Sequence, residues 1–231
     1  SREQRFSHPV PGSQLSQLTY AMQFDRSDYL SFLRAFAIDH GVQRIAASVT
    51  AVELNAQTGD IDRLMLDDGQ SLSADFYFDS SGDAAVLIEG ALASGFESWQ
   101  ELFPCDRRLE NLQSSAAPTP LLTSVVQERN GWQHSSALPG AVYRTHSYCS
   151  ASADEDEVLS FNQALQLQQR TDDSTSHIRK QKAGVRREFW KRNCVAIGES
   201  AGFAERFFFD PFHQTCSAIE RWLELLPDQA I

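Results

Sequence analysis

The sequence predicts an α+β fold in which a mixed sheet is flanked by helices. Two observations carry this prediction: a helical pattern is followed by several short strand-like runs, and near the other end a short apolar strand enters a final helix. The 231 residues are 42 % hydrophobic and 22 % charged. That composition is ordinary for a globular chain long enough to bury a core.

The first predicted element is a helix over Asp25–His40. Its apolar residues recur near helical spacing: Leu30, Leu33, Phe36, Ala37 and Ile38. Asp25 or Ser27 can cap the first turn, and Gly41 can end the helix in the left-handed conformation. Both ends of this helix are therefore marked in the sequence.

Three strand-like runs follow, separated by turns. They are Ile45–Val52, Ile61–Leu66 and Ser71–Phe78. Glycine-containing turn signals lie between them, at Gln57–Asp60 and at Asp67–Gln70. This spacing predicts a meander of neighbouring strands.

The rest of the chain has weaker patterns. A short helix is expected at Ala84–Gly95, a strand at Leu121–Glu128 and a helix over 151–170, whose acidic residues gather near its N-terminus. A strand at Asn193–Gly198 then leads to a last helix at Thr215–Leu226.

Composition excludes several classes of partner. The net charge of −11 argues against nucleic acid and anionic membranes, and no apolar run is long enough to span a bilayer. The four cysteines lack metal-ligand spacing, which favours free thiols in a reduced cytoplasm and no metal site. Seven basic residues within 177–192 are the exception, and we expect them to form a solvated face.

Two glycine segments are candidate ligand sites. Asp79–Asp83 reads DSSGD and begins at the last residue of the strand segment DFYFD, whereas Gly198–Phe203 reads GESAGF and follows CVAI. Small residues at the end of a strand let a ligand approach the backbone, and free amides there can bind an anion. By spacing alone, each segment is also explained as a simple turn.

Together with their neighbours, these segments resemble flavin-dependent tryptophan halogenases. The resemblance rests on Tyr20–Val42, on DFYFDSSGDAAVLI, on Gly131-Trp132 and, most specifically, on REFWKRNCVAIGESAGF. It implies part of a two-lobed FAD oxidoreductase fold like that of aromatic hydroxylases. It also implies that reduced FAD and oxygen oxidise a halide, which then reacts with an indole-like substrate, while a flavin reductase supplies the reduced FAD.

The resemblance also implies site residues. FAD would contact Asp79, Gly82, Gly198, Ser200, Ala201, Gly202 and Phe203. The substrate pocket would include Trp132, His134, Phe208 and Phe209. No catalytic residue is assigned, because the family's acidic residue after GxSxGF falls on Phe208 without a gap and on His213 after a five-residue shift.

Other departures concern the cofactor and the tunnel wall. The chain has no GxGxxG fingerprint and no lysine that matches the family's tunnel lysine, and Trp132 alone remains of the WxWxIP motif. We therefore expect part of a longer flavoprotein that is inactive by itself. An inactive remnant that serves as a binding module is the alternative.

The resemblance suggests four segments. They are an irregular N-terminal segment (1–19), a flavin-side α/β portion (20–110), substrate-side strands with an acidic helix (111–176), and a flavin-contacting strand, turn and C-terminal helix (177–231).

Overall fold

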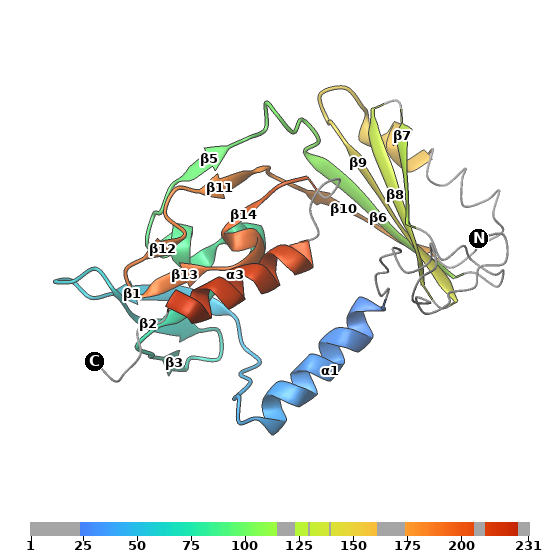
Figure 1. Cartoon of the computed structure of the whole chain (residues 1–231). Helices are drawn as coiled ribbons and strands as arrows, with labels where there is room; N and C mark the ends of the chain where they lie inside the picture. The colour runs from blue at the N-terminus through green and yellow to red at the C-terminus, as the bar shows by residue number, and fades with distance from the viewer. Residues whose placement is uncertain are drawn as a thin grey trace, which may run out of the picture. The chain divides into compact units, whose positions relative to one another are not determined.

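The computed structural model describes residues 24–114, 123–128, 130–138, 140–160, 174–205 and 211–225. The chain forms two compact units (Figure 1). The first unit combines Ser1–Arg44 with Arg108–Arg179, and the second combines Ile45–Arg107 with Lys180–Ile231. Within the described ranges, no helix has the length and apolar character that a membrane crossing requires.

The second unit contains three small sheets. One is the meander β1 (Val49–Leu54), β2 (Ile61–Leu66) and β3 (Ser71–Leu72). Another has the order β12 (Trp190–Lys191), β13 (Cys194–Ala196) and β4 (Tyr77–Asp79), and the last has the order β14 (Gly202–Phe203), β11 (Gly184–Arg186) and β5 (Phe96–Ser98). β4 and β13 run parallel, so segments far apart in the sequence meet in one sheet.

One apolar core joins the β1-β2-β3 sheet to the β12-β13-β4 sheet. Its buried members are Ile61, Leu64, Tyr77, Ala85, Leu87, Ile88, Leu92, Cys194 and Ala196. A short 3-10 turn, η2 (Gly82–Ala84), and a π-helix, η3 (Val86–Ala91), connect β4 to β5 and contribute several of these side chains. The backbone enters η3 through Ala85, which has a left-handed φ of 42° and is fully buried.

Helix α3 (Pro211–Leu225) packs on the other side of β4. Its Trp222 ring lies 4.3 Å from the Phe78 ring and 5.8 Å from the Phe76 ring. The Trp190 ring in turn lies 5.8 Å from the Phe76 ring. Aromatic packing of this kind therefore holds α3 to the parallel strand pair.

The first unit contains a five-stranded sheet with the order β10-β6-β9-β8-β7. The strands are β6 (Arg107–Ser114), β7 (Ser124–Glu128), β8 (Gly131–Leu138), β9 (Ala141–Tyr148) and β10 (Ser174–Lys180). Leu109, Tyr148, Ala153 and Val158 form its small core, the last of them from a helical turn at 155–160. Many of its other buried side chains are polar, including Asn111, Gln113, Thr145 and Ser147.

The helix predicted over Asp25–His40 is confirmed as α1 (Arg26–Asp39). Asp25 caps it by accepting hydrogen bonds from the amides of Ser27 and Asp28, and Gly41 follows it with a φ of 87°. The predicted acidic helix is present at 155–160, and its continuation to residue 170 lies outside the described residues.

Several predicted elements need correction. The expected single mixed sheet is replaced by several small sheets with few helices. The strand predicted over Ser71–Phe78 is two strands, β3 and β4, which belong to different sheets because β4 pairs with β13 instead of β2. The helix predicted at Ala84–Gly95 is the shorter π-helix η3, and α3 begins at Pro211 instead of Thr215.

The basic run was expected to be a solvated face, and this is wrong for Arg186. That side chain is buried in the second unit, whereas Arg187 and Arg192 are exposed. Parts of this run also lie in strands β10, β11 and β12. Their backbones pair with β6, β5 and β13 despite the high charge of the run.

All four cysteines are reduced thiols outside any disulfide, and Cys194 is the most deeply buried of them. Burial and the neighbouring Asp79 carboxylate raise its pKa to about 12. Because the thiolate is the reactive form, we expect iodoacetamide at pH 8 to leave Cys194 unmodified in the native protein. Half-buried Cys149 serves as the internal control in mass spectrometry, and equal labelling of the two would contradict this expectation.

Candidate functional site

The two glycine segments lie next to each other in the second unit. β4 and β13 are paired in parallel, with Tyr77 opposite Cys194 and Asp79 opposite Ala196. Both strands end at the same edge, so the turns that follow them meet there. This edge, at the carboxyl ends of parallel strands, is where ligands bind in open α/β sheets.

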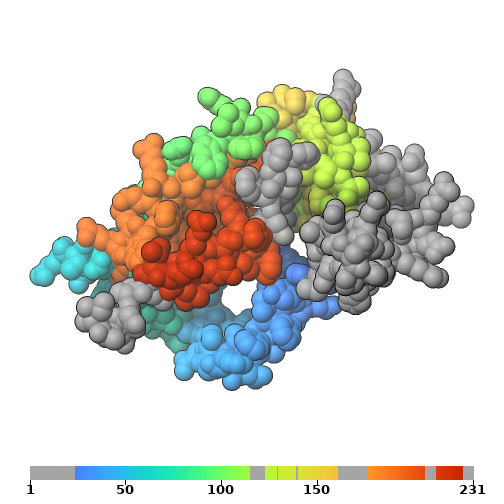
Figure 2. All heavy atoms as spheres, in the orientation of Figure 1, coloured from blue at the N-terminus to red at the C-terminus, as the bar shows by residue number. Residues whose placement is uncertain are grey.

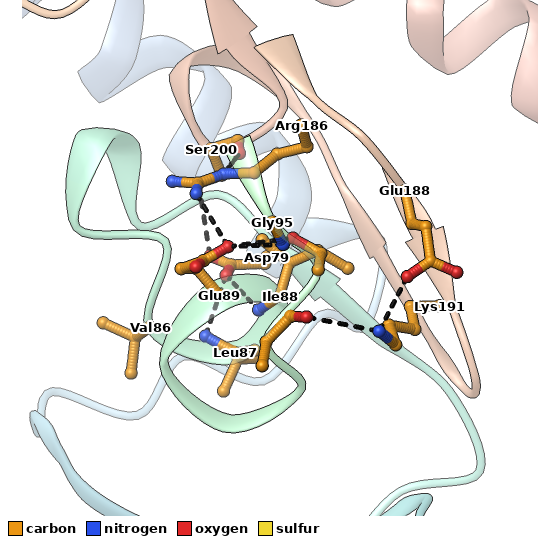
Figure 3. A network of polar contacts seen from close by, with 12 residues as sticks. Asp79, Val86, Leu87, Ile88, Glu89, Gly95, Arg186, Glu188, Lys191 and Ser200 are labelled. Carbon is orange, nitrogen blue, oxygen red and sulfur yellow. Dashed lines mark hydrogen bonds and ion pairs between the residues drawn. The ribbon is translucent and has the colours of Figure 1, made fainter. Parts of the chain in front are cut away.

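The buried Asp79 side chain contacts both turns, and Figure 3 shows it within the polar network. Its Oδ1 accepts hydrogen bonds from the amide and hydroxyl of Ser81, at 2.9 and 2.6 Å. Its Oδ2 accepts from the amides of Leu87 and Ile88, both at 2.8 Å. The Ser200 hydroxyl, on the second turn, lies 3.2 Å from Oδ1. One carboxylate therefore organises the DSSGD turn, the start of η3 and the GESAGF turn.

These contacts keep Asp79 ionised. Burial raises the pKa of its carboxyl group, but hydrogen bonds from Ser81, Ile88 and Leu87 outweigh burial and leave the pKa below its ordinary value. The side chain is 1 % exposed and its oxygens are engaged by protein donors. Its role in the site is to hold the surrounding backbone in place.

The backbone of both turns depends on glycine. Gly82 has a φ of 72° and Gly198 a φ of 63°, a region in which side chains are strained. The Ser200 hydroxyl lies 3.0 Å from the Gly82 carbonyl oxygen, and a Cβ placed on Gly82 would lie 3.9 Å from the Glu199 carboxylate. The turns are thus in direct contact.

An ion pair between the buried Arg186 and the partly exposed Glu89 supports the second turn, and the sequence analysis did not predict it. The Arg186 guanidinium donates to the Ser200 carbonyl oxygen at 3.1 Å and to Glu89 at 2.9 Å. The Arg186 amide donates to the Ala201 carbonyl oxygen at 2.8 Å. Glu89 also accepts from the Gly95 amide at 3.0 Å. Arg186 therefore links the turn to η3 and β5.

Replacing Arg186 with methionine is expected to lower the free energy of unfolding by about 1–3 kcal/mol, because the Ser200 carbonyl oxygen and Glu89 each lose the hydrogen bond from the guanidinium. Urea unfolding measures the effect. Arg187→Met is the matched control, since that neighbouring side chain is exposed. Equal losses in the two variants would show that the Arg186 contacts contribute nothing specific.

The other predicted cofactor residues all belong to this region. Ser200 is fully buried, and Gly202 and Phe203 form strand β14, paired with β11. Ala201 packs against the core of the second unit. The structure thus brings together all seven residues predicted to contact the cofactor: Asp79, Gly82, Gly198, Ser200, Ala201, Gly202 and Phe203.

The predicted substrate residues lie elsewhere in the chain. Trp132 and His134 are in β8 of the first unit, two positions apart and hence on one face of its sheet. Trp132 is buried and His134 is half-buried. Phe208 and Phe209 lie outside the described residues.

Solved structures of other proteins match nearly the whole of this chain. The chain matches BrvH, a flavin-dependent halogenase from Brevundimonas sp. BAL3, with a TM-score of 0.86 and 30 % identity, over 98 % of this chain and 46 % of BrvH. It matches Xcc4156, a flavin-dependent halogenase from Xanthomonas campestris, with a TM-score of 0.87 and 31 % identity, over 98 % of this chain and 45 % of Xcc4156.

Sequence comparison leads to the same group. The chain is 28 % identical to tryptophan 6-halogenase SttH from Streptomyces toxytricini over 193 residues, which are 82 % of this chain and 36 % of SttH. It is 27 % identical to tryptophan 7-halogenase RebH from Lentzea aerocolonigenes, over 92 % of this chain and 40 % of RebH. It spans less than half the length of these relatives. The tryptophan halogenase family model matches residues 1–231, so the chain belongs to the flavin-dependent tryptophan halogenase family.

Proposed function

We propose that this chain forms part of a flavin-dependent halogenase-like oxidoreductase that acts on an aromatic, indole-like substrate with reduced FAD and oxygen. The observation that carries the proposal is the joining of the two glycine turns at the ends of β4 and β13. Its relatives BrvH and Xcc4156 are flavin-dependent halogenases, and SttH and RebH are tryptophan halogenases.

The residues present fit one part of FAD. Gly82 and Gly198 expose backbone that carries no Cβ at these two positions, and at Gly82 an added Cβ would meet only the Glu199 carboxylate within 4 Å. Such bare backbone can lie against a planar ring. The ADP portion is not accommodated in the same way, because no GxGxxG segment is present in the sequence. We therefore assign this chain a wall of the flavin site and no chemical step.

The proposed substrate side is residues 111–176, which lie in the first unit. Trp132 and His134 share a sheet face there, and the polar residues that follow Trp132 make that strand less apolar than the family's WxWxIP motif. A more polar wall admits water to the oxidant more readily. We accordingly propose hydroxylation of the aromatic ring, or release of peroxide, as side reactions beside halogenation. A flavin reductase would supply the reduced FAD.

A hybrid protein tests this function. In it, this chain replaces the matched 46 % of BrvH, so that the remainder of the flavoprotein is present. We expect the hybrid to bind FAD, measured as quenching of flavin fluorescence. With a flavin reductase, NADH, bromide and indole, it should yield halogenated or hydroxylated indole, detected by mass spectrometry.

The matched variants are Gly198→Val and Gly140→Val. Both glycines have positive φ, but Gly198 is in the proposed flavin wall and Gly140 is in the β8–β9 connection with open space around it. We expect only Gly198→Val to weaken FAD binding. A folded hybrid that neither binds FAD nor consumes oxygen would overturn the proposal.

The second candidate is a catalytically inactive binding module. It is favoured by the absence of a tunnel lysine match and by the loss of the second Trp from WxWxIP. The same hybrid separates the two candidates, since a module of this kind gives a folded hybrid with no flavin-linked oxygen uptake.

A further inference from the structure

The five-stranded sheet of the first unit has a face that carries both aromatic and polar residues. Yellow-green atoms of its strands β7 and β8 are visible at the surface in Figure 2. Residues that pair directly in antiparallel strands share a face. The direct pairs between β8 and β9 are Trp132 with Ser147 and His134 with Thr145. These four residues define one side of the sheet, which we call the Trp132 face.

Strand β6, the neighbour of β9, adds two charged residues to the Trp132 face. Arg144 of β9 alternates with the residues of that face, so its side chain lies on the other side of the sheet. It donates a hydrogen bond to Gln113 of β6, which places the odd-numbered residues of β6 on that other side. Arg108 and Glu110 therefore lie on the Trp132 face. Arg179 of β10 joins them there, since it contacts Glu110.

These three charged residues form a cluster with a net positive charge. Arg108 Nη2 lies 2.6 Å from Glu110 Oε1, and Arg179 Nε lies 3.5 Å from Glu110 Oε2. Both oxygens of the carboxylate are thus engaged by guanidinium groups. Because two cations share one anion, the cluster can hold a second carboxylate.

Arg108 has a donor that lacks an acceptor. Its side chain is 6 % exposed, and within the described part of the chain its Nε is a buried donor without a hydrogen-bond partner. Buried donors in native proteins are nearly always satisfied by protein, water or a ligand. Arg179 is 59 % exposed, and among the described residues its ion pair is the long contact to Glu110, so its other donors remain available.

The span across the sheet suits a small aromatic acid. Neighbouring strands are about 4.8 Å apart, so β6 and β8, which β9 separates, lie roughly 10 Å apart. Trp132 offers an aromatic surface at one side of this span, and the two arginines offer donors at the other. An indole ring with a short acid side chain therefore has partners for both of its ends.

An ammonium group is disfavoured at the same place. Glu110 is the one carboxylate that the described strands contribute to the Trp132 face, and both of its oxygens are engaged. A ligand ammonium would meet net positive charge without an available anion, and this repulsion lowers its affinity. The cluster therefore selects an acid over an amine and over a zwitterionic amino acid.

We propose that Arg108 and Arg179 bind the carboxylate of an aromatic acid that lacks an ammonium group, and that such acids are the substrates of the proposed oxidoreductase. The substrate role rests on the proposed function, whereas binding needs only residues of the first unit. The two arginines are thus specificity-determining residues and take no part in a chemical step.

Isothermal titration calorimetry without flavin tests the acid site. The probes are indole-3-acetate, indole, tryptamine and L-tryptophan, each added to this chain and to the BrvH hybrid. We expect indole-3-acetate to bind at least about tenfold more tightly than each other probe, because a hydrogen bond between charged groups contributes about that factor. Acetate should bind weakly, because it lacks the ring.

Two variants in strand β10 make the test specific. Arg179→Gln removes a charge from the Trp132 face, and we expect the affinity for indole-3-acetate to fall about tenfold while that for indole stays unchanged. Lys180→Gln makes the same charge change at the next residue, which lies on the other face, and should keep the wild-type affinity. Both side chains are exposed, so both variants should keep the wild-type urea midpoint.

Three results would overturn the proposal. The first is indole-3-acetate that binds no more tightly than indole or L-tryptophan in both proteins. The second is an equal loss of affinity in Arg179→Gln and Lys180→Gln, which would mean a nonspecific effect of charge. The third is acetate that binds as tightly as indole-3-acetate, which would mean a simple anion site. A hybrid that binds the acid but shows no flavin-linked oxygen uptake would keep the acid site and overturn the oxidoreductase function together with the substrate role.

Discussion

Replacing Asp79 with alanine is expected to lower the free energy of unfolding of the second unit by about 3–5 kcal/mol, a magnitude typical of breaking a buried charged network. The substitution leaves the amides of Leu87 and Ile88 without their acceptor and disconnects Ser81 from Ser200. Both glycine turns lose their common anchor, so flavin binding by the hybrid protein should fall with stability.

Urea unfolding followed by tryptophan fluorescence measures the loss, because the second unit contains Trp99, Trp190 and Trp222. Asp83→Ala is the matched control, since that acid lies in the same turn but is exposed. Similar unfolding midpoints for the two variants would show that the Asp79 contacts do not stabilise the unit.

The effect of Asp79 should depend on pH in a defined direction. Its folded pKa lies below the ordinary value of 3.8, so the stability that ionisation contributes is fully present above that value and is lost as the pH falls through the folded pKa. Compared with wild type, Asp79→Asn should therefore show a constant deficit from pH 7 to about pH 5 and a shrinking deficit below about pH 4. A deficit that stays constant down to pH 2.5 would contradict this assignment.

The parts of the fold that local sequence determines were predictable. Helix α1 has its cap at Asp25, its apolar spacing and its stop at Gly41 within one short segment. The meander of β1 and β2 was likewise marked by the turn at Gln57–Asp60. In both cases the interacting residues are close in sequence, so a pattern can reveal them.

Long-range pairing was not predictable in this way. Ser71–Phe78 looks like one strand, but its second half pairs with Cys194–Ala196, more than 100 residues later. The sheet around β8 and β9 has so many polar residues that alternation is weak, although Thr145 and Ser147 are buried. A single sequence does not show which distant strand satisfies these backbone groups.

In the candidate site, too, local features were predictable and long-range contacts were not. Its glycine turns could be found because small residues directly follow apolar strands at Asp79 and Gly198. Arg186 could not be separated from the six other basic residues of its run, because its partner Glu89 is 97 positions away. Burial alone distinguishes Arg186, and burial is a property of the folded chain.

Replacing Gly184 with alanine is expected to lower the free energy of unfolding of the second unit by about 2–5 kcal/mol, the combined cost of an unfavourable backbone conformation and of overpacking. Gly184 has a φ of 152°, and a Cβ there would collide with the Glu97 carbonyl oxygen and the Phe96 ring. Because the first obstacle is backbone of the paired strand, β11 and β5 must move apart.

That movement reaches the candidate site through Arg186, which lies two residues after Gly184 in the same strand. A displaced β11 carries the guanidinium away from the Ser200 carbonyl oxygen and from Glu89, so Gly184→Ala should weaken FAD binding of the hybrid as well as unit stability. Gly90→Ala is the control, because its Cβ would meet nothing closer than 3.8 Å. If Gly184→Ala unfolds at the same urea concentration as Gly90→Ala, the close approach of β11 to β5 is not a constraint on this fold.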